Sequence, residues 1–140
     1  MDKALSYMGL ARRAGVLSVG EESCGTAVSE GRARLLLLAG DASDNARRRA
    51  EGFILHRRAL LRQLPWSKAE LSALLGRDGC SMVCFTDLGL AAEFAAAMAL
   101  KDENWTDTAQ ALAARRDKAA RRRAAPRKNK RDKGGEKNGA

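Results

Sequence analysis

The chain has 140 residues, of which 45% are hydrophobic and only 4% aromatic, and its formal net charge is +9 at pH 7. This length suits one domain, whose core must be built mainly from aliphatic side chains. Apolar runs such as residues 35–39 are far shorter than the roughly 20 residues of a membrane span, and the N-terminal pattern differs from a signal peptide, so we expect a cytoplasmic protein without membrane contact.

Two predicted helices open the chain and are separated by a short connection. The first lies between Asp2, whose side chain can cap its start, and Gly15, which can end it. Residues 16–19, VLSV, read as a connection. The second helix begins after Gly20 and ends at Gly31. Its apolar face consists of Cys24, Ala27 and Val28.

A buried strand is predicted at residues 34–40, RLLLLAG. A continuous apolar run of this kind is typical of a strand that is covered on both faces of a sheet. Ser43 or Asp44 can cap a third helix. A short strand is expected at residues 59–64.

The next helix has a capping box, because Ser67 and Glu70 can each bind a free amide at its start. Gly76 ends it. A last strand, residues 81–86, precedes a helix that Asp87 can cap. This alternation predicts an α/β fold, a three-layer α/β/α sandwich around a mixed sheet of roughly four strands.

The positive charge is concentrated at the C-terminal end. Residues 1–100 contain 13 basic and 11 acidic side chains, whereas residues 101–140 contain 13 basic and only 6 acidic ones. We therefore predict a folded domain, 1–100, and a basic extension, 101–140, that is helical up to Pro126 and disordered beyond it. We expect Trp105 to dock that helix on the domain. An excess of this size indicates a polyanionic partner.

The three cysteines, Cys24, Cys80 and Cys84, fit a reducing compartment. Cys80 and Cys84 have even spacing on an expected strand, so we expect them to face the same side. A zinc site would need all three together with His56, the single histidine. Buried cysteine more often serves as a small hydrophobic residue, so we expect no metal and no cofactor.

Several motifs at their mutual spacing resemble one family: GLARRAG followed by GEE, then GRARLLLLAGDAS with Asn45, then the pair Leu75–Gly76. The chain is similar here to the RNA-binding superfamily of the ribosomal proteins L-seven-Ae and L-thirty-e, and within it to the small bacterial branch called YlxQ. The resemblance covers about residues 3 to 99. It implies the same three-layer fold and a non-catalytic, RNA-binding role that includes kink-turn recognition in other members.

The resemblance implies that the helix after Gly20 contacts RNA. In better-known members an Asn and a Glu in its first turn bind bases and a later Lys binds phosphate. The matching positions here carry Glu22, Ser23 and Thr26, so this chain departs from the kink-turn motif. The apolar loop that packs on an extruded base is replaced by residues 76–79, where Arg77 can stack on a base or hold a phosphate.

Each candidate residue also has a structural interpretation. Glu21 and Glu22 can simply interact with the helix dipole, which is worth about 0.3–1 kcal/mol each. Asp41 can help to cap the third helix, or it can accept hydrogen bonds from bases at the end of a strand. Arg13 and Arg32 can be solvated, or they can contact phosphates around the Gly20 helix start.

No catalytic motif is present: the chain has no GxGxxG, no P-loop and no nucleophile elbow. We therefore predict a monomeric, non-catalytic RNA-binding protein that associates with the ribosome or another structured RNA. The alternative is a protein-interaction module of the translation or transcription machinery whose tail binds polyanions incidentally.

Overall fold

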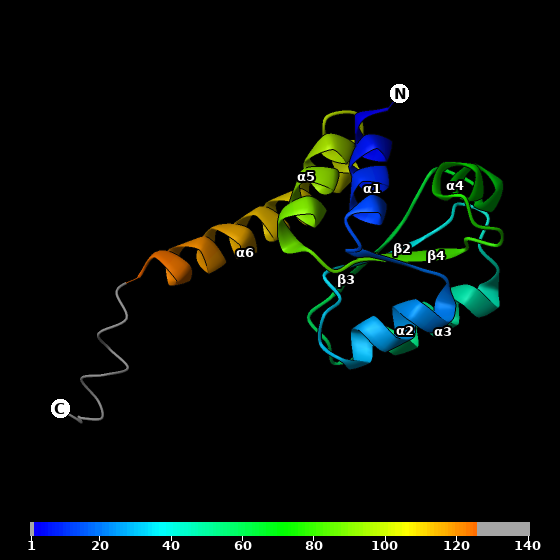
Figure 1. The fold of residues 1–140 in the computed structure, drawn as a ribbon, viewed down its shortest axis with the longest axis horizontal. Helices are drawn as coiled ribbons and strands as arrows, with labels where there is room; N and C mark the ends of the chain where they lie inside the picture. Colours follow the sequence, from blue (N-terminus) through cyan, green and yellow to red (C-terminus); the bar gives the residue numbers. More distant parts are fainter. Residues whose placement is uncertain (1, 126–140) are drawn as a thin grey trace.

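The computed structural model of the chain describes residues 2–125 (Figure 1). The first half contains α1 (Lys3–Arg13), β1 (Leu17–Val19), α2 (Glu21–Ser29), β2 (Leu35–Leu38) and α3 (Asp44–Ile54). The second half contains β3 (Leu60–Gln63), α4 (Lys68–Leu75), β4 (Met82–Phe85), α5 (Leu88–Ala99), the 3-10 turn η1 (Glu103–Trp105) and α6 (Thr106–Ala124). The part of the predicted tail from Pro126 onwards lies outside the described residues.

The sheet is mixed and has four strands in the order β1-β4-β2-β3. β4 pairs antiparallel with both β1 and β2, and β3 pairs parallel to β2 at the opposite edge. Figure 1 shows α2 and α3 on one face of this sheet and α1 and α5 on the other. The predicted α/β/α sandwich is therefore confirmed.

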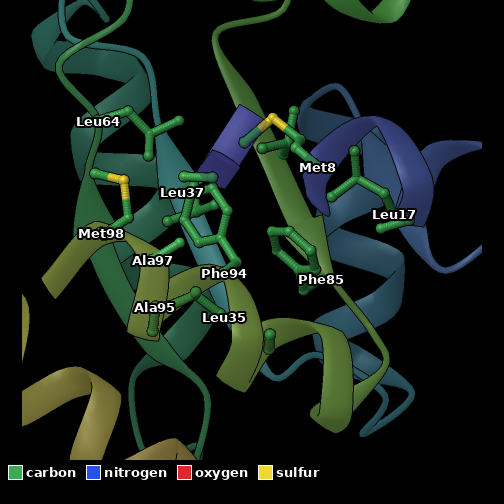
Figure 2. Packing of buried hydrophobic residues seen from close by; sticks show 14 of the residues in the cluster. Met8, Leu17, Leu35, Leu37, Leu64, Phe85, Phe94, Ala95, Ala97 and Met98 are labelled. Carbon is green, nitrogen blue, oxygen red and sulfur yellow. The ribbon is translucent and has the colours of Figure 1, made fainter. Parts of the chain in front are cut away.

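The two central strands are buried on both faces because their side chains alternate between two apolar layers. Leu35 and Leu37 pack in the larger core with α1, α4 and α5 (Figure 2), whereas Leu36 and Leu38 pack in the smaller core against α2 and α3. Each of these leucines is at most 1% exposed. Burial of one such side chain contributes about 1.5–3 kcal/mol, so the leucine run anchors both layers.

The predicted helix starts are formed by the side chains that the sequence indicated. Asp2 accepts from the first-turn amides of α1, and Asp87 does the same for α5. Ser43 caps α3 through the amide of Ala46. Ser67 and Glu70 form the reciprocal capping box of α4. These local signals fix where α1, α3, α4 and α5 begin.

Two of our expectations about the fold are wrong. Residues 17–19 form a strand rather than a connection, because buried Leu17 and Val19 alternate with Ser18 and pair with β4 at the sheet edge. Cys80 and Cys84 do not share a face. Cys80 precedes the strand, next to Gly79 with a φ of +71°, and packs in the larger core, whereas Cys84 packs in the smaller one.

The apolar core continues past residue 100. Trp105 and Leu112 are 2% and 0% exposed and belong to the larger core, and Trp105 packs edge-on against Phe94 at 5.8 Å between ring centroids. Trp105 thus docks the extension as predicted. None of the helices described between residues 2 and 125 combines the length and apolarity that crossing a bilayer requires.

Gly40, at the end of β2, has no room for a side chain. A Cβ there would lie 2.9 Å from the backbone oxygen of Leu64. We expect Gly40→Ala to lower the free energy of unfolding by about 1–3 kcal/mol, because the backbone must move. Gly52→Ala is the matched control: it lies in α3 with open space around it, and should raise stability by about 0.5–1 kcal/mol. Urea unfolding of both variants tests this, and equal signs would contradict it.

Candidate nucleic-acid interface

Strand pairing brings the start of α2 and the loop after β2 to the same end of the sheet. Val19 pairs with Val83, and the amide of Gly20 donates to the carbonyl of Met82 at 2.8 Å. On the other side of β4, Leu38 also pairs with Met82. The start of α2 and the loop after β2 therefore flank the start of β4, about 5 Å from it on each side.

The start of α2 is open and has no side-chain cap. Gly20 occupies the N-cap position with a φ of +97°, a conformation that favours glycine, and no side chain among residues 2–125 accepts from the first-turn amides. A helix start of this kind presents free N–H groups together with the positive end of the helix dipole. It can therefore donate hydrogen bonds to an acceptor on a bound molecule.

Arg77 lies directly against this helix start. Its Nη1 donates to the carbonyl of Val19 at 2.7 Å, and its Nη2 lies 3.3 Å from where a Cβ on Gly20 would be. The loop that carries it turns at Gly76 and Gly79, both with positive φ. The guanidinium is thus fixed over the glycine while the residue stays exposed. We name this surface the α2 shelf, which comprises Gly20, Glu21, Glu22, Ser23 and Arg77.

The two glutamates of the α2 shelf have different surroundings. The Oε1 of Glu21 accepts from the Nη1 of Arg49 at 3.1 Å, so this carboxylate links α2 to α3. Glu22 is exposed and has no ion pair within residues 2–125. Ser23 and Thr26 are also exposed. Glu22 is therefore the shelf carboxylate that is free to accept from a ligand. Arg49 was not among our predicted residues, because no sequence signal links positions 28 residues apart.

Asp41 lies at the same sheet end but acts as a helix-capping group. Its Oδ1 accepts from the backbone N of Lys68 at 2.8 Å and thereby ties the loop after β2 to the start of α4. The expectation that Asp41 caps the third helix is wrong, because Ser43 caps that helix and Asp41 bonds elsewhere. It serves α4, because β2 and β3 run parallel and end side by side. Two strand spacings, roughly 10 Å, separate this loop from the α2 shelf.

Arg13 approaches the α2 shelf from another layer. It lines an open groove of about 470 Å³ between α1 and α4, together with Arg12 and Gly76. Gly76 immediately precedes Arg77, so this groove continues into the shelf loop. The two exposed arginines of α1 thus add positive charge beside the predicted interface.

Arg32 does not lie near the Gly20 helix start, and our expectation that it does is wrong. It follows the opposite end of α2, which spans nine residues and thus roughly 13 Å. There its Nε is 2.8 Å from the Oε1 of Glu30. The helix between the two positions separates them, which adjacency of the motifs in the sequence could not reveal.

The cysteines are packing residues. Burial, with Cys84 and Glu21 nearby, raises the pKa of the Cys24 thiol far above its ordinary value, and burial raises the pKa of Cys84 to about 11. Thiols in this state are poor nucleophiles at neutral pH. Within the described part of the chain, no group of three or more His, Cys, Asp or Glu side chains could hold a metal ion.

The arrangement defines an α/β/α sandwich with an open, glycine-started helix beside a fixed arginine. No family model matches the chain, and no curated protein matches it. Among solved structures 168 chains match. One is a protein of unknown function from Bacillus halodurans C, with 26% sequence identity and a TM-score of 0.63, and the match covers 69% of this chain and 97% of that one. The likeness supports the fold, and it brings no activity because a shared fold does not define a function.

Proposed function

We propose that this protein binds structured RNA without catalysing a reaction, and that the α2 shelf contacts unpaired nucleotides. The observation that carries the proposal is the uncapped start of α2 next to the guanidinium of Arg77, held 2.7 Å from the carbonyl of Val19. Free amides and a fixed arginine on an exposed surface suit a ligand with both acceptors and a flat face. An unpaired base has both.

The chemistry of the shelf favours bases over phosphates. The carboxylate of Glu22 can accept from base amino groups, and it repels a phosphate. The amides of the first turn can donate to base nitrogen and oxygen atoms. Arg77 can stack on a base with its guanidinium plane while its Nη1 remains bonded to the backbone.

The motifs GLARRAG, GEE and GRARLLLLAGDAS support the same role, because they resemble those of the L-seven-Ae and L-thirty-e superfamily and its YlxQ branch. We accordingly propose a cytoplasmic ribonucleoprotein component that associates, as a monomer, with the ribosome or another structured RNA. Arg13 in the α1–α4 groove would contact the adjoining phosphates.

The test is the preference of the full chain among three hairpins of equal length: a kink-turn, a simple bulge and a fully paired stem. We expect the wild type to prefer a hairpin with unpaired nucleotides in 150 mM salt. Glu22→Lys should raise the affinity for the paired stem and reduce the preference about tenfold or more, since one good base contact is worth ~1–3 kcal/mol. Fluorescence anisotropy competition measures both quantities.

Glu51→Lys on α3 is the matched control, because Glu51 is exposed and the change in charge is the same. It should raise all three affinities equally and leave the preference unchanged. A wild type without preference, or a Glu22→Lys variant that keeps it, would overturn the proposal. The alternative role, a protein-interaction module whose acidic α2 start binds a basic partner, would then be the better supported function.

A further inference from the structure

Five basic side chains surround a second cleft. This cleft of about 270 Å³ lies where the chain enters β2, where α3 connects to β3, and along the C-terminal half of α6. Its cationic lining consists of Arg34, Arg58, Arg115, Lys118 and Arg122. We name this set the cationic cleft. An adjoining cleft of about 260 Å³ shares Arg34 and Arg58 and adds Arg57 and His56.

The cationic cleft and the α2 shelf lie at opposite ends of the sheet. Arg34 immediately precedes Leu35, whose register partner on β4 is Phe85, and the amide of Arg34 donates to the carbonyl of Phe85 at 2.9 Å. Gly20, in contrast, bonds to Met82 at the other end of β4. The two surfaces are therefore separate sites.

The face of α6 that is turned toward the domain is buried in its first half and basic in its second half. Thr108 and Leu112 are buried against the domain. The positions that continue this face at helical spacing are Arg115, Lys118 and Arg122, and they line the cleft. Figure 1 shows this end of α6 extending beyond α5. Arg115 is half-buried there, whereas Lys118 and Arg122 are exposed, so a ligand can reach the cations of this face from solvent.

The charges of the cleft are not neutralised by ion pairs within the described part of the chain. Across residues 2–125, none of its five cations has a carboxylate oxygen within 4.0 Å. The nearby acids are engaged elsewhere: Glu93 pairs with Arg116, and Asp87 caps α5. The Nη1 of Arg115 is directed at the backbone oxygen of Arg58 at 2.9 Å. Burial, and then the like charges of Arg58 and Arg34, lower the pKa of Arg115.

We propose that the cationic cleft is a second RNA contact, which holds the phosphodiester backbone while the α2 shelf contacts unpaired bases. Clustered, unpaired cations raise the energy of the free protein, and a bound phosphate backbone would relieve that repulsion. The protein would then hold two segments of one RNA at opposite ends of its sheet. The choice of RNA as the occupant depends on the function proposed above.

The test compares two double variants of the full chain with equal charge change on the same helix. Lys118→Gln/Arg122→Gln removes two cleft cations, whereas Arg121→Gln/Arg123→Gln removes two exposed cations that do not line the cleft. Binding of a 30-nucleotide oligouridylate is measured from 50 to 200 mM salt. We expect the slope of log K against log salt to be shallower by about 1.4 in the cleft variant, so that the ratio of wild-type to variant affinity changes roughly sevenfold over this range. In the control variant the slope should change by less than a third of that.

A second measurement is independent of RNA. Inorganic pyrophosphate should raise the thermal unfolding midpoint of the wild type and of Arg121→Gln/Arg123→Gln equally, and raise that of the cleft variant by less than half as much. Without pyrophosphate, the cleft variant should unfold at the same or a higher temperature than the wild type, because repulsion is reduced. A lower midpoint would contradict the absence of internal partners for these cations.

The outcomes separate this inference from the proposed function. Equal slope changes for both double variants would overturn the proposal that the cleft binds RNA, since they would indicate only a general electrostatic attraction by the positive charge of the chain. A slope change confined to the cleft variant, in a protein without preference for unpaired nucleotides, would retain the cleft and overturn the role of the shelf. A pyrophosphate effect without any RNA binding would overturn both RNA proposals.

Discussion

We expect the replacement of Trp105 by alanine to lower the free energy of unfolding by about 3–5 kcal/mol, the cost of emptying a large aromatic site in a core. Trp105 is 2% exposed and packs against Phe94. Arg62 lies over the indole at 4.4 Å from the ring centroid, and its Nη1 donates to Thr108 at 2.7 Å and to the carbonyl of Asn104 at 3.0 Å. The substitution therefore removes a core residue and the partner of a fixed cation together.

Trp66→Ala is the matched control for this prediction. Trp66 is only partly buried, beside the Nζ of Lys101 at 4.8 Å from its ring centroid, and its loss should cost less than half as much. Guanidinium unfolding followed by circular dichroism measures both variants. If the Trp105 variant lost less than about 1 kcal/mol, the docking of η1 and α6 on the domain would be disproved.

Truncation after Ala125 should separate affinity from selectivity. The residues removed, 126–140, contain six basic and two acidic side chains, a net charge of +4. If four phosphates lose their partners, the slope of log K against log salt for single-stranded RNA becomes shallower by about 3. The ratio of the RNA affinity of the full chain to that of the truncated variant then falls roughly fiftyfold between 50 and 200 mM salt.

The truncation point follows from the structure. Truncation after Leu100 would delete Trp105 and Leu112, which belong to the core, so it would test folding rather than binding. The variant that ends at Ala125 should keep the unfolding midpoint of the full chain and its preference for unpaired nucleotides. Should the preference disappear together with residues 126–140, the folded surface would not read RNA, and the protein-interaction alternative would account for the α2 shelf.

Local chemistry explains why much of the fold was predictable. A capping side chain acts within three residues, so Asp2, Ser67 and Asp87 mark helix starts wherever those helices pack. The leucine run predicts a strand that is covered on both faces of the sheet, and β2 is such a strand. The three residues of β1 carry too short an alternation to predict a strand, and only pairing with β4 makes them one.

The candidate site was predictable in part for the same reason. Gly20, Glu22 and Ser23 are consecutive or nearly so, and one helix start places them together. Arg77 lies more than 50 residues away, and the resemblance alone indicated that its loop belongs with the helix. The predicted location of Arg32 was wrong because a position close in sequence can lie a full helix length away in space. The predicted roles of the site residues in RNA binding remain predictions.

The sequence by itself determined where the helices begin, which strand is central, and that the positive charge lies at the C-terminal end. The tertiary structure decided which residues share an end of the sheet. It placed Arg77 over Gly20, assigned Asp41 to the start of α4, and gathered Arg34, Arg58 and Arg115 around one cleft. The physical reason is that capping and periodicity act over a few residues, whereas strand order and direction arise from pairing between distant segments.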